Sequence, residues 1–244
     1  MSIIIEICAD SYKSVVNANK SNANRIELCS ALKIGGITPS ASFIKKAVEI
    51  SNIPVNVLIR PRGGNFVYSD EEFDIMCQDI KISKDIGANG IVSGVLTNDG
   101  QIDIERSKKL VELSRPLEFT FHRAFDNCIN QNEAIIDVIN IGAIRLLTSG
   151  GFANAKKGKK AIIDLHNNYG NKIIIMPGSG VNNMNAKEFI DSGIKEIHLS
   201  ASTFQKDITY KNPKLGNMGY VQKDNGAIGF NVSGVEKIDN LLKP

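Results

Sequence analysis

Residues 54–64 read PVNVLIRPRGG, a short apolar segment that ends in two arginines and two glycines. β-Branched residues occupy alternate positions, so one face of the predicted strand is apolar while the other becomes polar toward Arg60 and Arg62. Two guanidinium groups at a strand end can bind a carboxylate or a phosphate in a bidentate manner. The alternative is a structural ion pair with acidic residues on adjacent strands.

Strand-like segments of this kind alternate with helix-sized segments along the chain. The eight segments are residues 3–8, 25–29, 54–64, 90–95, 117–122, 144–151, 172–180 and 196–202. Strands too apolar to face water, alternating with helices, indicate a parallel sheet covered by helices. Eight such units in a chain close to the roughly 250 residues typical of the fold predict a single-domain α/β structure over residues 1–244, a (β/α)8 barrel of the TIM type. An open doubly wound sheet is the second candidate.

Capping residues and glycines mark the helix boundaries. Ser69 and Glu72 have the spacing of a capping box, and Gly87 ends the helix that they begin. Other helices are expected at about residues 10–22, 38–50, 104–114, 131–141, up to 169 and up to 192. Residues 203–231 have no clean period, so they are expected to form a long irregular loop after the eighth strand, followed by a short closing helix over 233–242.

The composition excludes several classes of protein. The 244 residues are 42% hydrophobic, and the net charge of +3 comes from 29 basic and 26 acidic residues without a dense basic run, so we expect a full core and no nucleic-acid partner. No apolar run approaches the length that spans a bilayer, and no amino-terminal signal pattern is present. We therefore expect no membrane partner and a cytoplasmic location. Four cysteines without paired spacing are expected to be thiols, and a homodimer is compatible with this fold.

In a barrel of this type, function lies at the carboxyl ends of the strands. The polar and thiol side chains near these ends are Glu6, Cys8, Glu27, Cys29, Arg60, Arg62, Thr120, His122, Thr148, Ser149, Glu196, His198 and Ser200. A barrel interior that served only packing would carry valine, isoleucine and leucine here. The set therefore predicts a functional site at this end.

Two glycine-rich strand ends predict an anion site. They are TSGG at residues 148–151 and PGSGV at residues 177–181, and the second belongs to the seventh loop, which often binds phosphate in barrels. The residues expected to hold the ligand are Gly150, Gly178, Ser179 and Gly180. Asn182 or Asn183 is expected to cap the following helix, whose amides would then point at the anion. The alternative is that the glycines serve only the sharp turns.

Together these segments resemble the CutC family, named for a proposed part in copper homeostasis. The segments are IEIC, RIELC followed by GGITPS, VLIRPRGGNFVYSDEEF, FTFHRAFD, LLTSGG and IIIMPGSGV, in the family's order and spacing between residues 3 and 200. The resemblance implies a TIM-type barrel, a cytoplasmic location and binding of Cu(I) by the cysteines that match Cys8 and Cys29. The chain departs from the family at Ser179, where glycine is usual.

Copper binding by this pair agrees with the chemistry of its side chains. Cu(I) is soft and prefers thiolate and thioether ligands. Neighbouring parallel strands lie about 4.8 Å apart, so Cys8 and Cys29 could place two sulfur atoms on one ion. The alternative is that both are inert core thiols. Cys77 is expected to pack in the core, and Cys128 is expected to be a loop thiol without a role.

An enzyme that acts on a small phosphorylated or carboxylated metabolite is the second functional hypothesis. In that case Glu27 or His122 would move a proton, Arg60 and Arg62 would hold a carboxylate, and the glycine-loop amides would hold a phosphate. A third alternative is purely structural: Glu6 and Glu27 pair with the arginines in a buried network, and the histidines bond to nearby carbonyl groups.

Overall fold

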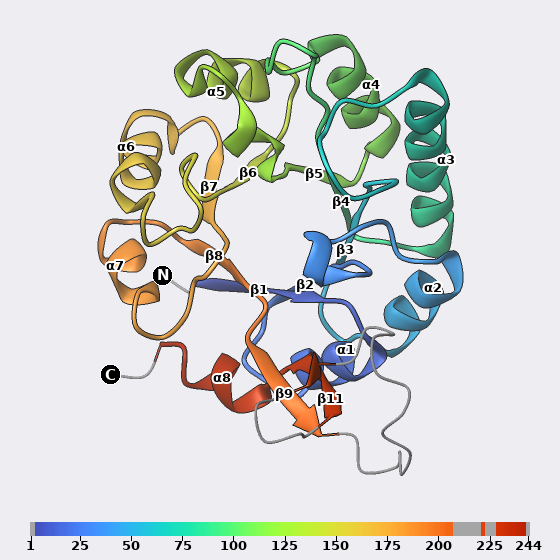
Figure 1. The fold of residues 1–244 in the computed structure, drawn as a ribbon, viewed down its shortest axis with the longest axis vertical. Coiled ribbons are helices and arrows are strands. Elements are labelled where there is room, and N and C mark those ends of the chain that lie inside the picture. Colours follow the sequence, from blue (N-terminus) through green and yellow to red (C-terminus); the bar gives the residue numbers. More distant parts are fainter. Residues whose placement is uncertain (1–2, 207–220, 223–227, 243–244) are drawn as a thin grey trace.

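Eight parallel strands form a closed ring in the computed structural model, which describes residues 3–206, 221–222 and 228–242. The strands are β1 (Ile4–Ala9), β2 (Arg25–Leu28), β3 (Val55–Leu58), β4 (Gly90–Ser93), β5 (Glu118–Phe121), β6 (Arg145–Thr148), β7 (Ile174–Pro177) and β8 (Glu196–Leu199). Hydrogen-bonded ladders run from β7 through β4 and β1 to β8, and β7 lies beside β8, which closes the barrel (Figure 1). The predicted (β/α)8 barrel is confirmed.

Helices connect successive strands and cover the outside of the ring (Figure 1). They are α1 (Tyr12–Asn19), α2 (Ala41–Ile50), α3 (Asp70–Ile86), α4 (Ile104–Ser114), α5 (Gln131–Asn140), α6 (Lys159–Tyr169) and α7 (Ala186–Asp191), with two short 3-10 helices, η1 (Leu32–Ile34) and η2 (Arg123–Asn127). The predicted capping box is confirmed, because Ser69 and Glu72 each accept a hydrogen bond from the other's amide. Among the described helices, none is long and apolar enough to cross a membrane.

The main apolar core lies between the ring and the helices, where Ile7 on β1 and Phe121 on β5 are fully buried. Alternate residues of each strand point the other way, into the ring. A second, smaller apolar cluster consists of Cys8, Cys29, Leu58 and Val92. Both strand-end cysteines are therefore packed among apolar neighbours, and all four cysteines of the chain are free thiols.

Toward the amino ends of the strands, the ring is filled by buried ion pairs. Arg25 Nε lies 2.5 Å from Glu6 Oε2, and Arg25 Nη2 lies 2.5 Å from Glu196 Oε2. Arg145 extends the network, with its Nε 2.6 Å from Glu196 Oε2. A buried network was the structural alternative from the sequence, but with the arginines near the end of the third strand as partners. The cations are instead Arg25 and Arg145, and their partners are Glu6 and Glu196. Glu27 is not part of the network, because its contact is with Cys8.

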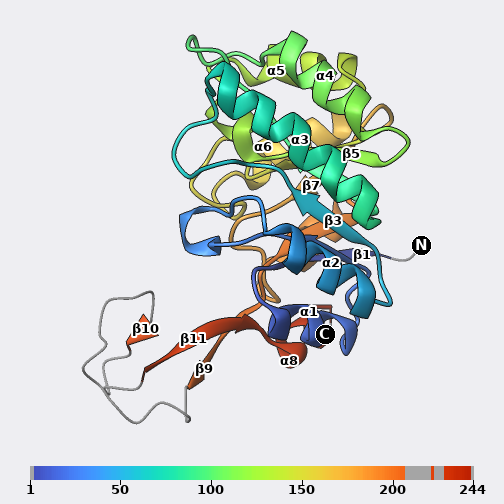
Figure 2. The ribbon, with the colours of Figure 1, turned by 90° about the vertical axis from the view of Figure 1, so that its right-hand side faces the viewer.

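The segment after β8 is not wholly irregular, so the predicted long loop over residues 203–231 is wrong at both of its ends. β9 (Ser202–Lys206) pairs antiparallel with β11 (Ile228–Ser233), and β10 (Val221–Gln222) lies on the other side of β11. This small sheet extends away from the barrel (Figure 2). Residues 207–220 and 223–227 of the predicted loop lie outside the described residues. The closing helix is α8 (Val235–Asp239), which lies next to α1 and is shorter than predicted.

Candidate functional site

A cavity of about 380 Å³ opens at the carboxyl ends of the strands. Its lining includes Cys8, Glu27, Arg60, Phe66, His122, Arg123, Leu147, Ser179, Gly180, His198 and Ser200. Eight residues singled out from the sequence are among them, and they come from strand ends on different sides of the ring. Cys29 lies directly behind Cys8 in the wall.

The two strand-end cysteines are in contact. Cys8 Sγ lies 3.6 Å from Cys29 Sγ, and Cys8 Sγ lies 3.4 Å from Glu27 Oε1. Both sulfur atoms are buried. The hydrogen bond with Cys29, together with burial, raises the pKa of the Cys8 thiol well above its usual range. Without a cation, Cys8 is therefore a thiol that a soft metal ion would have to deprotonate.

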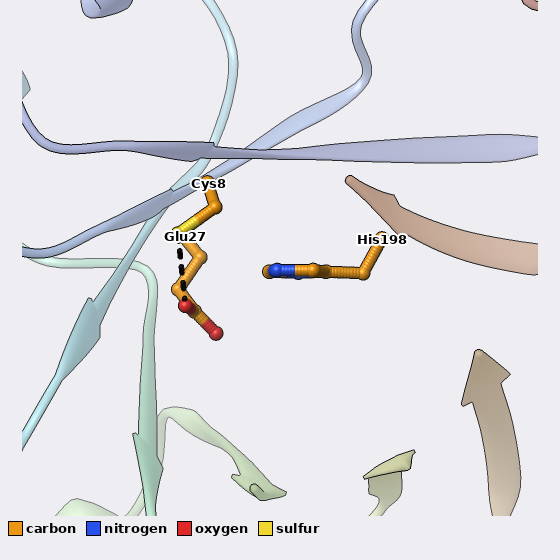
Figure 3. A group of neighbouring side chains, drawn as sticks. All are labelled: Cys8, Glu27 and His198. Carbon is orange, nitrogen blue, oxygen red and sulfur yellow. Dashed lines mark hydrogen bonds between the residues drawn. The ribbon is translucent and has the colours of Figure 1, made fainter. Parts of the chain in front are cut away.

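His198 brings a third metal-ligating group to the cysteines. Donor atoms of Cys8, Glu27 and His198 all lie within 4.8 Å of one another, and Figure 3 shows His198 extending from β8 toward the other two. The second oxygen of Glu27, Oε2, has no hydrogen-bond partner in the described structure, and burial raises the pKa of this carboxyl group. The donor set fits a metal ion, because one side contributes sulfur and the other an imidazole nitrogen.

Glu6 orients the imidazole of His198. His198 Nδ1 lies 2.8 Å from Glu6 Oε1. Burial opposes the charge on Glu6, but Arg25 and His198 outweigh it and lower the pKa of Glu6 to about 2, so this group is a carboxylate at neutral pH. Nδ1 is then the donor. Burial opposes the charge on His198, but Glu27 and Glu6 outweigh it and raise the pKa of His198, so a metal ion at Nε2 would have to displace a proton. A carboxylate behind a histidine is the usual support of a metal-binding imidazole.

Arg60 is anchored in the wall of the cavity by three carbonyl groups rather than by a carboxylate. Its guanidinium donates to the carbonyl oxygens of Ile34 (3.0 Å), Gly36 (2.7 Å) and Gly64 (2.7 Å). It also lies 4.9 Å from the centre of the Phe66 ring. Arg60 thereby ties together the loops after β2 and β3.

His122 is a poor general base in this structure. Its Nδ1 accepts a hydrogen bond from the Ala124 amide at 3.3 Å, so the proton of the neutral ring resides on Nε2. Burial, with a smaller contribution from Arg60 and Arg123, lowers the pKa of His122 to about 3. At neutral pH the ring is therefore uncharged, and its Nε2 group is a hydrogen-bond donor.

This depressed pKa predicts a pH dependence of stability. In the unfolded chain His122 is protonated below about pH 6.5, whereas in the folded protein it stays neutral down to about pH 3. The free energy of unfolding should therefore fall by up to about 1.4 kcal/mol for each pH unit between these values. Urea unfolding at pH 6.0 and 5.0 should show a smaller loss in His122→Asn than in the unchanged protein. Equal losses would contradict a buried neutral His122.

Three residues expected at an anion site do not line the cavity: Arg62, Gly150 and Gly178. Arg62 turns outward to Glu72, with its Nε 2.6 Å from Glu72 Oε1, and is not among the residues that line the cavity. Gly150 does not line the cavity either. A Cβ atom there would lie 2.7 Å from the carbonyl oxygen of Gly158, so this glycine permits close packing of the sixth loop.

The TSGG loop does bind an anion, but the anion is the protein's own Asp126. The amides of Ser149 and Gly151 donate to the Asp126 carboxylate at 3.0 Å and 3.1 Å. The Thr148 hydroxyl donates to it at 2.5 Å. The amides of Ser149 and Gly151 are therefore not available to an external phosphate.

In the PGSGV loop the Gly178 amide donates to the Thr148 carbonyl, whereas the amides of Ser179 and Gly180 stay free. Ser179 and Gly180 both have positive φ, 70° and 75°, and their amide groups have no acceptor among the described residues. Gly178 does not line the cavity but permits close packing, because a Cβ atom there would lie 2.4 Å from Leu147 Cδ1. The predicted helix cap at Asn182 or Asn183 is wrong, since α7 begins after Asn185.

Comparisons with known proteins agree with the fold. Residues 3–203 match the model of the CutC family. A relative from Vibrio vulnificus named as a CutC family protein is 44% identical over 222 residues, 88% of this chain and 89% of the relative. A relative of the same name from Salmonella typhi is 41% identical over 91% of this chain and 85% of its own. A solved structure from Streptococcus agalactiae, described as a candidate copper homeostasis protein CutC, shares 34% identity with a TM-score of 0.77 over 81% of this chain and 98% of that one.

Proposed function

Since this chain belongs to the CutC family, we propose that it takes part in copper homeostasis by binding Cu(I) at the carboxyl end of the barrel. Cys8 and Cys29 are the principal ligands of this proposed site. The observation that carries the proposal is the 3.6 Å contact between their two sulfur atoms in the wall of the cavity. The free thiols also support a reducing cytoplasmic location. Self-association of the protein is a separate prediction.

The sulfur separation supports a third ligand. Two metal–sulfur bonds of about 2.3 Å in a straight line would need sulfurs roughly 4.6 Å apart, which is more than the observed 3.6 Å. A bent arrangement leaves one side of the ion open. His198, whose Nδ1 is engaged by Glu6, has a donor atom within 4.8 Å of Cys8 Sγ and is our candidate for the third ligand.

Catalysis by acid–base chemistry is the weaker candidate. His122 is uncharged at neutral pH and its Nδ1 is occupied, so it has no free lone pair with which to accept a proton. Glu27 is a buried carboxyl group with a raised pKa, but its contact is with the Cys8 sulfur that we assign to the metal. Metal binding therefore uses more of the observed contacts than proton transfer does.

The test is an anaerobic competition titration of the reduced protein against a chromogenic Cu(I) chelator. We expect the protein to remove one equivalent of Cu(I) from the chelator. Failure to compete for any copper would contradict the proposal outright.

Replacing the third ligand should weaken this binding without abolishing it. His198→Asn should lower the affinity for Cu(I) by roughly ten- to a hundredfold, comparable to the loss of supporting contacts in other metal sites. The matched control is His166→Asn, because His166 lies on α6 and is not among the residues that line the cavity. If His198→Asn and His166→Asn bind Cu(I) equally well, His198 is not a ligand and the cysteines act alone.

A further inference from the structure

Two buried N–H groups in the cavity wall have no acceptor among the described residues. They are Nε of Arg60 and Nε2 of His122. Both side chains are deeply buried, each residue being 5% exposed. Nε2 of His122 carries the ring proton because Nδ1 accepts from Ala124. Burying a donor without a partner is costly, so we expect an acceptor here that the described residues do not supply.

The two donors belong to one small region. Phe66 lies against both side chains: its ring centre is 4.9 Å from Cζ of Arg60 and 4.8 Å from the ring centre of His122. Arg60 follows β3 and His122 follows β5, whereas Cys8 lies on β1. Arg60 donates to the carbonyl of Gly36, which packs beside Cys29, so the region borders the proposed copper site but does not use its sulfur atoms.

The charge of Arg60 is not neutralised by a carboxylate. The other buried arginines among the described residues, Arg25 and Arg145, each lie against acidic side chains. Arg60 makes no such ion pair with any described residue and is held by three carbonyl groups and the Phe66 ring. A buried cation without a counter-charge is costly unless an anion approaches it. The missing acceptor is therefore expected to be negatively charged.

We propose that the cavity binds a small organic anion whose carboxylate or phosphate group is received by Arg60 and His122. The volume of about 380 Å³ lies within the range of roughly 300–1,000 Å³ that is typical of small-molecule sites. The free amides of Ser179 and Gly180, on the wall formed by the seventh loop, can receive a second polar group of the same molecule. This site does not depend on copper, and it gives His122 the role of a neutral hydrogen-bond donor.

The histidine ring nitrogens provide the test, because the chain has only three histidines. The reduced, metal-free protein is titrated with succinate and, separately, with inorganic phosphate up to 10 mM, and the ring signals are followed by nitrogen-15 NMR. We expect at least one probe to shift the Nε2 signal of His122 saturably, while His166 stays unchanged. A response to succinate alone identifies a carboxylate site, and a response to phosphate alone identifies a phosphate site.

A pair of arginine variants tests whether anion binding depends on Arg60 and not on positive charge nearby. Arg60→Gln should weaken binding of the active probe at least tenfold. Arg62→Gln, which removes the same charge two residues later but outside the cavity, should bind as the unchanged protein does. If Arg60→Gln does not fold, His122→Phe replaces it, with binding measured by calorimetry and the same loss expected.

The proposal is overturned if neither probe shifts the His122 signal at 10 mM, since water alone would then satisfy the two donors. It is also overturned if the Arg60 or His122 variant binds the probe as tightly as the unchanged protein. The Cys8→Ser, Cys29→Ser double variant should retain anion binding. Loss of copper binding and loss of anion binding are therefore distinguishable outcomes.

Discussion

Replacement of Cys8 and Cys29 together by serine should abolish tight binding of Cu(I). The hydroxyl groups of serine are hard, weakly acidic ligands, and Cu(I) prefers soft thiolate sulfur. With both sulfurs gone, only His198 and Glu27 of the metal-ligating cluster remain. In the anaerobic competition titration, the double variant should leave all the copper with the chelator, a loss in affinity of several orders of magnitude.

The matched control removes the same number of thiols elsewhere. Cys77 is buried on α3 and Cys128 follows η2, and neither lines the cavity. The Cys77→Ser, Cys128→Ser variant should keep its single equivalent of Cu(I). If both double variants bind copper equally, the strand-end cysteines are inert core thiols, and the copper proposal fails for this protein.

Removal of Arg25 from the centre of the barrel should have the largest effect on stability. Its guanidinium contacts Glu6 and Glu196 at 2.5 Å each, and all three residues are buried. Arg25→Met would leave two carboxylates facing each other without this cation. Breaking a buried ion pair from one side typically costs about 3–5 kcal/mol. Urea unfolding at pH 7 should show a loss in this range.

Two further variants test the cause of this loss. In Lys160→Met the exposed ion pair with Asp164 is removed, and the free energy of unfolding should change by less than about 1 kcal/mol. In the double variant Glu6→Gln, Arg25→Met, one of the two stranded carboxylates is absent while Arg145 keeps its partner Glu196, so part of the stability should return. A loss below about 1 kcal/mol in Arg25→Met would contradict the structural role of the network.

Much of the fold was predictable from local patterns. The alternation of apolar strands with capped helices predicted the (β/α)8 barrel, and the Ser69 capping box was predicted residue by residue. The antiparallel pairing of β9 with β11 was not predictable. Their paired residues are separated by a long connection instead of a short turn, so no local signal marked the hairpin.

The residue types of the candidate site were predictable from the sequence, but the contacts between these residues were not. IEIC and IELC are near copies in sequence, which suggests that Glu6 and Glu27 lie side by side. The ladder is offset instead, so Glu6 lies opposite Arg25 and Cys8 lies opposite Glu27. This offset reflects the stagger of strands that a closed barrel requires. It places the ion pairs in one layer and the cysteines in the next.

By itself, the sequence determined which side chains lie inside the ring, because alternation along a strand is a local property of the backbone. It also determined that thiol, imidazole and guanidinium groups gather at one end of the barrel. Only the tertiary structure decided that Arg62 pairs with Glu72 while Arg60 stays without a carboxylate. The same holds for Asp126, which occupies the amides of the TSGG loop while those of Ser179 and Gly180 stay free. The reason is that each of these outcomes depends on strand stagger and loop packing between residues distant in sequence, and no local pattern encodes either.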